Sequence, residues 1–313
     1  MHLHEHKDFD GLIATVSDSM QIDPTLVEKD YWIMHSLWGL QQQKFKFELK
    51  GGTSLSKGFG LIHRFSEDID IRIEPPIGLN VKTGKNQDKE AHIQSRAEFY
   101  DWFARTLSIP GVQNIQRDHA FDEQEKMRSG GVRINYISKA PVLNGLKDGV
   151  LLELGFDDTS PNQSVDISSW AYDHAIQFVK DLDDNRAKNV LCYLPEYTFV
   201  EKLQAISTKF RQYKQGIGFP RNFLRHYYDI YCLLDCQPVL NFIQSDKYHS
   251  RKVKRFSSAD NLIIAQNDAF LLGDVNDRNL FKSEYQKVAS LYYKGQPSFD
   301  DLINRIHQHI RHL

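Results

Sequence analysis

The sequence contains few cysteines, no long apolar run and little net charge. Three cysteines in 313 residues are too few for a disulfide framework, so we expect free thiols at Cys192, Cys232 and Cys236. No stretch reaches the roughly 18 apolar residues of a membrane-spanning helix, and the first residues lack the apolar segment of a signal peptide. The formal net charge of −2 excludes a strong overall attraction to nucleic acid. We therefore expect a globular cytoplasmic protein without membrane contact.

Two common nucleotide-binding fingerprints are also missing. The chain has neither the Walker loop G-x-x-x-x-G-K-[ST] nor the dinucleotide motif G-x-G-x-x-G. It has instead the segment KGGTSLSKGFG, in which Gly51, Gly52, Thr53 and Ser54 form a turn that opens a short helix. Backbone N–H groups at such a turn can hold phosphate oxygens, although a Gly-Gly step alone is more often a plain tight turn.

Paired aspartates follow this turn in the segment RFSEDIDIRIEPP. The alternation of Asp68 and Asp70 with isoleucines predicts a strand, with Ser66 and Arg72 on the aspartate face. Neighbouring carboxylates repel each other unless a cation lies between them, and a hard divalent ion such as Mg²⁺ or Mn²⁺ takes oxygen ligands. The alternative is structural, with one aspartate capping a turn and the other pairing with Arg64 or Arg72.

The remaining pattern predicts strands mixed with helices, followed by helices alone. Asp23 before Pro24 is an expected helix start. The histidines near the start, His2 and His4 among them, are expected to be flexible, and residues 122–131 are expected to form a mobile tip between two strands. We expect helices over residues 24–41, 53–60 and 88–108, strands over 44–50, 67–74, 112–120, 131–139 and 150–156, a loop over 77–87, two short strands within 157–196, and helices over 198–214, 221–235, 258–272, 278–293 and 298–312.

Glu153 is a single carboxylate in the apolar segment VLLELGF. An unpaired carboxylate in a buried strand is costly, so this side chain needs a cation. Arg133, Lys50 and a metal ion shared with the aspartates are the candidates.

Charged residues also stand out in the helical part. Lys202 and Lys209 are seven residues apart and share one helix face, which points either to a ligand or to solvent. Asp229 is on the next expected helix, where the alternative to a site role is a surface pair with a neighbouring arginine. The run KYHSRKVKRF, residues 247–256, interleaves basic and aromatic residues, which suits either a nucleic-acid contact or a solvated loop.

The segments GGTSLSKGFG and RFSEDIDI together resemble the nucleotidyltransferase toxins of the AbiEii/AbiGii family, from abortive-infection and toxin–antitoxin systems. These toxins belong to the DNA polymerase β-like superfamily, whose motif is a Gly-Gly-Ser/Thr turn followed by Asp-x-Asp on a strand. VEKDYWIMHSLWGL, FVEKLQAISTKF and RHYYDIYCLL resemble further motifs of the family. The resemblance covers roughly residues 20–235.

The resemblance implies an α+β fold. The expected architecture is a polymerase β-like nucleotidyltransferase core, in which helices flank a mixed sheet, followed by a C-terminal helical domain. We expect N-terminal helices packing on the core over residues 1–44, the nucleotidyltransferase core over 45–196 and the helical domain over 197–313.

The resemblance also implies roles for individual residues. The expected catalytic residues are Asp68, Asp70, Glu153, Lys202 and Asp229, of which Asp68, Asp70 and Glu153 would bind Mg²⁺ or Mn²⁺. The expected nucleotide-binding residues are Gly51, Gly52, Thr53, Ser54, Lys57, Ser66 and Lys209. Ser66 would hydrogen-bond to the surroundings of the metal, or be a site of modification itself.

The implied reaction transfers a nucleoside monophosphate from an NTP to an acceptor hydroxyl. The expected acceptor is the 3′ end of tRNA, which would block translation, and the expected partner is a cognate AbiEi-like antitoxin protein. Two alternatives are an adenylyltransferase acting on a small molecule or a protein, of the aminoglycoside-modifying kind, and a non-catalytic nucleotide-binding module. No motif in the sequence selects one NTP over another.

Overall fold

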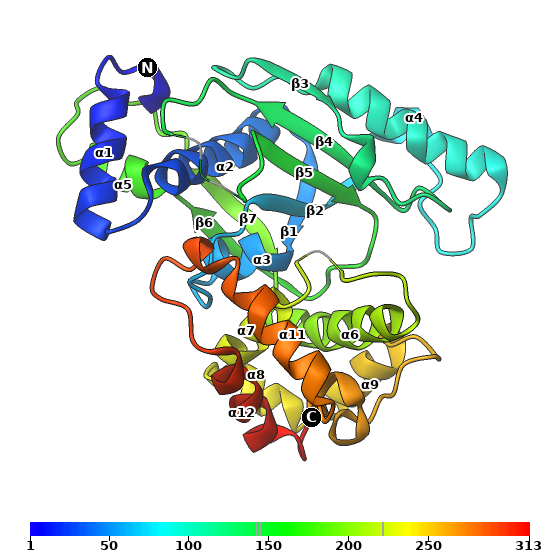
Figure 1. The fold of residues 1–313 in the computed structure, drawn as a ribbon. Helices are drawn as coiled ribbons and strands as arrows, with labels where there is room; N and C mark the ends of the chain where they lie inside the picture. The colour runs from blue at the N-terminus through cyan, green and yellow to red at the C-terminus, as the bar shows by residue number, and fades with distance from the viewer. Residues whose placement is uncertain (142, 144, 221) are drawn as a thin grey trace. The chain divides into compact units, whose positions relative to one another are not determined.

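The chain divides into two compact units. The computed structural model describes residues 1–141, 143, 145–220 and 222–313 (Figure 1). The first unit comprises Met1–Gly58 and Phe65–Tyr193, and the second comprises Phe59–Arg64 and Leu194–Leu313. Residues 1–44 therefore lie in the same unit as the sheet, and the second unit begins close to the position expected for the helical domain.

A mixed seven-stranded sheet forms the centre of the first unit, in the order β3-β4-β5-β2-β1-β7-β6. The pairs β2–β5 and β1–β7 are parallel, and the other neighbours are antiparallel. This mixed sheet with flanking helices confirms the expected α+β core. The strands are β1 (Lys46–Lys50), β2 (Asp68–Glu74), β3 (Asn114–Arg117), β4 (Ser129–Asn135), β5 (Val150–Gly155), β6 (Asn162–Ile167) and β7 (Ala187–Tyr193).

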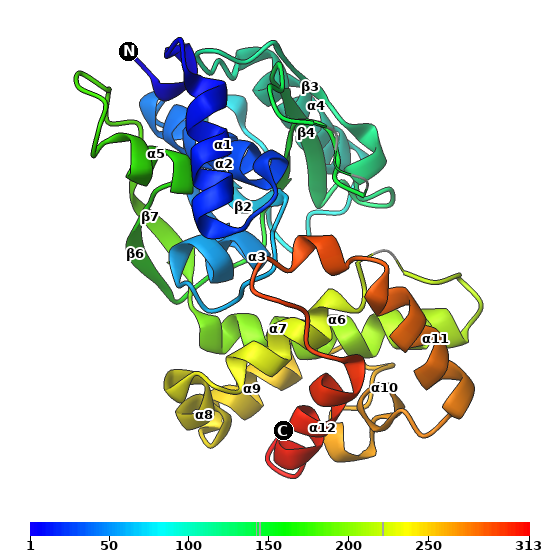
Figure 2. The same ribbon diagram turned by 60° about the vertical axis from the view of Figure 1, so that its left-hand side comes forward.

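Helices cover the sheet of the first unit (Figure 2). The N-cap Asp23 accepts a hydrogen bond of 2.9 Å from the Thr25 N–H, as the Asp-Pro start predicts. This helix, α2 (Pro24–Gln42), packs on β5 and β7 and against the helices α1 and α5. Helix α4 (Glu90–Thr106) packs on β3 and β4. The helices are α1 (Phe9–Met20), α2 (Pro24–Gln42), α3 (Gly51–Thr53), α4 (Glu90–Thr106) and α5 (Trp170–Ala175).

Helix α2 is buried around almost its whole circumference, including three consecutive charged residues, Glu28, Lys29 and Asp30. Successive residues of a helix are about 100° apart, so three charges in a row cannot share one solvent-facing stripe. Each of these charges therefore has an internal partner. The Glu28 carboxylate, for example, accepts hydrogen bonds from the N–H groups of Lys139 and Ala140.

The expectation that the first histidines are flexible is wrong for His2 and His4. Their rings pack against His35 of α2, at centroid distances of 5.2 and 4.9 Å. The Nδ1 atom of His4 also lies 2.8 Å from the Tyr31 hydroxyl. Aromatic residues on α2 thus supply a surface that orders the start of the chain.

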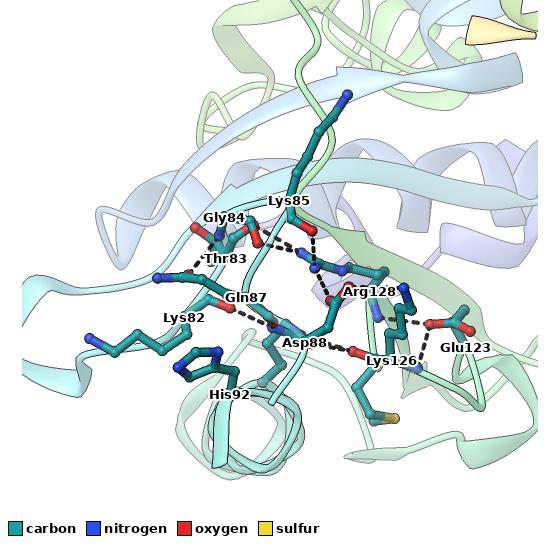
Figure 3. A network of polar contacts seen from close by, with 12 residues as sticks. Lys82, Thr83, Gly84, Lys85, Gln87, Asp88, His92, Glu123, Lys126 and Arg128 are labelled. Atoms are coloured by element: carbon teal, nitrogen blue, oxygen red, sulfur yellow. Dashed lines mark hydrogen bonds and ion pairs between the residues drawn. The ribbon is translucent and has the colours of Figure 1, made fainter. Parts of the chain in front are cut away.

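The expectation of a mobile tip at residues 122–131 is also wrong. Figure 3 shows the polar network that ties this tip to the loop before α4. The Arg128 guanidinium donates to the carbonyls of Thr83, Gly84 and Lys85, and Lys126 Nζ lies 2.9 Å from a carboxylate oxygen of Asp88. Both segments are polar and irregular, yet they order each other.

The second unit contains the remaining helices, as expected for the C-terminal part. Two of these helices, α8 and α9, fall between the expected helices and were not predicted. The expected helix over 221–235 begins at Arg225, and Arg221 lies outside the described residues. The helices are α6 (Pro195–Lys214), α7 (Arg225–Leu233), α8 (Gln237–Ile243), α9 (Asp246–Arg255), α10 (Asp268–Leu271), α11 (Val275–Gln286) and α12 (Phe299–His309). In the part of the chain that the structure describes, no helix combines the length and the apolar character needed to cross a bilayer.

The basic and aromatic run at residues 247–256 is mostly helix α9, not a loop. Tyr248, Arg251 and Lys252 are buried. The Arg251 guanidinium lies 2.8 Å from the Glu201 carboxylate, and the Tyr248 hydroxyl donates to the carbonyl of Leu313 at 2.7 Å. Four of the ten residues in the run are therefore buried inside the second unit, Phe256 included, which weakens its interpretation as a nucleic-acid surface.

Candidate functional site

Asp68 and Asp70 are on β2 and Glu153 is on β5, two neighbouring strands in the middle of the sheet. Figure 1 shows where these strands lie. The parallel register places Asp70 beside Glu153 and Asp68 beside Leu151. Side chains at paired positions leave the sheet on the same face, and residues two apart on a strand share that face. Asp68, Asp70 and Glu153 therefore form a cluster of three carboxylates, hereafter the carboxylate cluster.

Three of the cation partners suggested for these carboxylates are engaged elsewhere, whereas Lys50 stands opposite Asp70 in the register of β1 and β2. Arg64 pairs with Asp229, Arg72 pairs with Glu48 at 3.1 Å, and the Arg133 guanidinium lies 2.5 Å from Asp118. The structural alternative, in which Arg64 or Arg72 neutralises the aspartates, is therefore wrong.

Glu153 is held in an environment that opposes its ionisation. Burial, followed by the negative charges of Asp70 and Asp68, raises the pKa of Glu153 to about 8, and the ammonium of Lys147 only partly offsets this. Carboxyl groups this close cannot all ionise without a further cation.

The glycine turn directly adjoins the carboxylate cluster. Gly51 follows β1 with a φ of 72°, and a Cβ atom at this position would lie 2.2 Å from Oδ2 of Asp70. Only glycine combines this left-handed backbone with such a close approach. Thr53 and Ser54 are buried, and their hydroxyls donate to the carbonyls of Asp68 at 2.5 Å and Tyr193 at 3.3 Å. The hydroxyls thus fix the turn on the sheet. That the backbone N–H groups of the turn, including that of Gly52, bind phosphate remains a prediction.

Lys57 and Ser66 occupy the flanks of the turn and of β2. The Lys57 ammonium lies 2.8 Å from the buried carboxylate of Asp30 and 5.2 Å from the centre of the Trp170 ring. It thereby links the segment after the turn to α2 and α5. Ser66 precedes β2 and is partly exposed. Nucleotide binding by either residue remains a prediction.

Three charged residues that sequence analysis did not select surround Asp68. The Lys147 ammonium lies 3.2 and 3.3 Å from the two carboxylate oxygens of Asp68. The Lys147 N–H donates to Glu67 at 3.0 Å, and its carbonyl accepts from the Lys29 ammonium at 2.5 Å. Lys29 is buried, which lowers its pKa to about 8 despite the neighbouring carboxylate of Glu67.

A divalent cation fits the chemistry of the carboxylate cluster. All its donors are carboxylate oxygens, which Mg²⁺ and Mn²⁺ prefer, and the absence of a side chain at Gly51 lets the turn lie close to Asp70. Within the described residues, however, no three acidic, histidine or cysteine side chains are already arranged to hold a metal ion. The carboxylate oxygens are thus suitable ligands for the ion, but in this structure those of Asp68 contact the Lys147 ammonium.

The second unit holds the other charged residues that the family resemblance selected. Asp229 of α7 is fully buried, and it contacts Lys202 of α6 at 2.9 Å and Arg64 through two hydrogen bonds of 2.7 and 2.8 Å. Burial alone would raise the pKa of Asp229, but Arg64 and Lys202 hold it below its usual range. The surface alternatives for Lys202 and Asp229 are therefore wrong, because both side chains are buried.

An excess of positive charge surrounds Asp229. Burial, and then the cations of Lys202, Lys209, Arg225 and Arg64, lowers the pKa of His226 well below its usual value. One carboxylate in the company of several cations is an arrangement that suits a further anion. The predicted phosphate roles of Lys202 and Lys209 agree with this charge and remain predictions.

The sequence held signals for some of the residues that were missed. Three consecutive charges on α2 marked Lys29 as internal, and Glu67 and Arg64 lie inside the segment RFSEDID that carries the motif. Lys147 had no such signal, since it lies 79 residues after Asp68 in a polar connection without periodicity.

The comparison with protein families decides the family. The model of the "Nucleotidyl transferase AbiEii toxin, Type IV TA system" family matches residues 33–305. The chain belongs to the AbiEii family. The resemblance found in the sequence is therefore confirmed, and the match extends beyond residue 235 through most of the helical unit. Membership of an AbiEii toxin–antitoxin family implies a nucleotidyltransferase with an antitoxin partner.

Other comparisons add less than the AbiEii match. A crystal structure of an antigenic nucleotidyltransferase-like protein from Paracoccidioides brasiliensis aligns at 14% identity with a TM-score of 0.37, covering 72% of this chain and 86% of that chain. No curated protein matches the sequence.

Proposed function

We propose that this AbiEii-family protein is a metal-dependent nucleotidyltransferase that moves a nucleoside monophosphate from an NTP to an acceptor hydroxyl. The observation that carries the proposal is the carboxylate cluster, in which three carboxylates lie side by side on β2 and β5 and the turn at Gly51 approaches Asp70. Acidic oxygens beside a phosphate-binding turn are what phosphoryl transfer requires, because positioning and charge neutralisation supply most of its rate.

The proposed reaction forms one bond and breaks one. The acceptor oxygen attacks the α-phosphorus while its proton passes to Glu153 or to water, the bond from that phosphorus to the oxygen shared with the β-phosphorus breaks, and pyrophosphate leaves. A divalent ion held by Asp68, Asp70 and Glu153 would neutralise the phosphates and lower the pKa of the acceptor hydroxyl. The backbone N–H groups at Gly51 and after it would hold phosphate oxygens.

Charge that builds on the leaving pyrophosphate calls for a fixed cation, and we propose Lys202 for this role, with Lys209 as a further phosphate contact. The support is that Lys202 is buried and oriented by Asp229, so little freedom remains to be lost when it binds. Asp229 then acts as a positioning residue, because Arg64 and Lys202 occupy its oxygens.

We propose the 3′ end of tRNA as the acceptor, blocked translation as the outcome and an AbiEi-like protein as the antitoxin, all in the cytoplasm. The support for these finer assignments is the toxin–antitoxin family to which the chain belongs.

The deciding experiment incubates the protein with Mg²⁺, total cellular RNA and each of the four radiolabelled NTPs in turn. We expect labelled RNA of tRNA size from at least one NTP. Asp70→Asn should lower the transfer rate by about a hundredfold or more, because it removes a charge that acts on the reacting phosphate. Glu74→Gln, at the exposed end of the same strand, is the matched control and should keep full activity.

Three outcomes would change the proposal. Label on a small molecule or a protein, with none on RNA, would replace the acceptor. Nucleotide binding without transfer to any acceptor would favour a binding module. Equal transfer by Asp70→Asn and the wild type would remove the carboxylate cluster from the mechanism.

A further inference from the structure

We infer that the ammonium of Lys147 is a tethered counter-ion of Asp68, which a divalent cation has to displace when it binds to the carboxylate cluster. The inference rests on the metal site of the proposed function and adds a residue that controls it. Its basis is the position of Lys147 Nζ, 3.2 Å from Oδ2 and 3.3 Å from Oδ1 of Asp68. A cation within this distance of both oxygens uses the lone pairs that a metal ion would need.

The position of Lys147 is built by contacts on both sides of its backbone. Its N–H donates to Oε2 of Glu67 at 3.0 Å, and its carbonyl accepts from the Lys29 ammonium at 2.5 Å. Lys29 and Glu67 are both buried and lie 3.8 Å apart at their charged atoms. The backbone of Lys147 is therefore fixed by an internal ion pair, which aims the side chain at Asp68.

The arrangement of the carboxylates agrees with a cation already in place. No three acidic, histidine or cysteine side chains in the described parts of the chain are arranged to take a metal ion as they stand, although Asp68, Asp70 and Glu153 share one face of the sheet. Neighbouring carboxylates need a positive charge between them, and Lys147 supplies one.

The ammonium also has room to leave. Lys147 lines a polar cavity of about 330 Å³ together with Asn114, Asn135 and Tyr136. Its Nζ atom lies 4.6 Å from the centre of the Phe121 ring, a contact that can hold a cation without a carboxylate. Since its side chain is about a quarter exposed, at 26%, displacement needs no opening of the core.

The test measures Mn²⁺ binding to the nucleotide-free protein by calorimetry and by the loss of the free Mn²⁺ resonance signal. Lys147→Met removes the charge and keeps the length of the side chain, so we expect the Mn²⁺ dissociation constant to fall by about tenfold or more. Lys147→Arg keeps the charge and should leave the constant within about twofold to threefold of the wild type. Lys139→Met makes the same change at an exposed lysine of the same connection and should have no effect.

The thermal midpoint provides a second measurement that does not depend on activity. Metal-free Lys147→Met should unfold at a lower temperature than the wild type, and saturating Mn²⁺ should raise its midpoint by more than it raises that of the wild type. A variant that merely folds poorly would not bind Mn²⁺ more tightly.

The outcomes separate this inference from the proposed function. If Lys147→Met binds Mn²⁺ as tightly as the wild type or more weakly, the inference is overturned. The metal site itself stands if the wild type binds Mn²⁺ and Asp70→Asn does not. If neither the wild type nor Lys147→Met binds Mn²⁺ at millimolar concentration, both the inference and the metal dependence of the proposed function are refuted.

Discussion

Gly51 shows how one residue couples the turn to the carboxylate cluster. Its φ of 72° disfavours any side chain, and a Cβ would meet Oδ2 of Asp70 at 2.2 Å. We expect Gly51→Ala to lower the free energy of unfolding by roughly 2–5 kcal/mol and to reduce nucleotidyl transfer strongly, because Asp70 has to move. Chemical denaturation and the labelled-NTP assay measure the two effects.

Gly60 provides the matched control for this prediction. It also has a positive φ, of 65°, but nothing lies within 4 Å of a Cβ built there. Gly60→Ala should therefore cost about 1–2 kcal/mol from the backbone alone. If Gly51→Ala lowers the free energy of unfolding no more than Gly60→Ala does, and retains nucleotidyl transfer, the close approach of Gly51 to Asp70 is not needed for stability or activity.

Site residues that stand out from the residues next to them in the sequence could be predicted. Asp68 and Asp70 alternate with isoleucines, and Glu153 is the single charge of an apolar strand, so their shared face follows from periodicity once β2 and β5 are neighbours. Lys147 could not be found in this way, and the run of charges on α2 indicates that Lys29 is internal without showing its partner. Their roles depend on backbone contacts between segments more than a hundred residues apart.

At the scale of elements, α6 and α7 are joined by a buried charge cluster. Asp229 neutralises Lys202 and Arg64, and all three side chains are buried. Asp229→Asn would leave two buried cations without a full counter-charge, so we expect a loss of about 3–5 kcal/mol in the free energy of unfolding. Urea denaturation measures it.

Asp235, shortly after α7, offers the comparison for Asp229. Its carboxylate pairs with Arg305, but 65% of its side chain is exposed. Asp235→Asn should therefore cost less than about 1 kcal/mol. Similar losses for the two variants would mean that the pairs of Asp229 contribute no more than a surface ion pair.

Helices and strands were predicted correctly where the residues at or near their ends determine where they begin and end. The Asp-Pro start of α2 and the alternation of β2 agree with the structure to within one or two residues at each end. Helix α8 was missed because it has only seven residues, and α9 because its sequence is mostly charged and has few apolar residues in helical spacing, so that the packing of both is decided by the rest of the second unit. In the same way, Arg128 and Glu123 order two polar segments that have no pattern of their own.

At the scale of the whole molecule, the sequence motifs are divided between two compact units. The glycine turn and the carboxylate cluster belong to the first, whereas Arg64, Lys202 and Asp229 belong to the second. The family resemblance predicted a core followed by a helical part, and that order is confirmed. It could not predict that the short segment Phe59–Arg64 joins the second unit, because six residues carry too little periodicity to show where they pack.

The stability of the molecule should depend on pH through a buried histidine. The Nδ1 atom of His35 lies 2.8 Å from the Asn185 amide nitrogen, which donates, so the Nε2 N–H donates to the Pro110 carbonyl at 2.9 Å. The ring is thus satisfied in its neutral form. Burial, despite the Pro110 bond, lowers the pKa of His35 from 6.5 to about 3. Between about pH 6.5 and 3, His35 is therefore protonated in the unfolded chain but neutral in the folded protein.

Stability is accordingly complete above pH 6.5 and falls as the pH drops towards 3. For His35 alone, lowering the pH from 7.5 to 5 should remove about 2 kcal/mol of the free energy of unfolding. His35→Gln, which cannot be protonated, should flatten the pH profile by that amount in urea denaturation. His312→Gln, at an exposed position, should leave the profile unchanged. An unaltered slope in His35→Gln would mean that His35 takes up its proton without unfolding, and that the cluster of rings around it accommodates the charge.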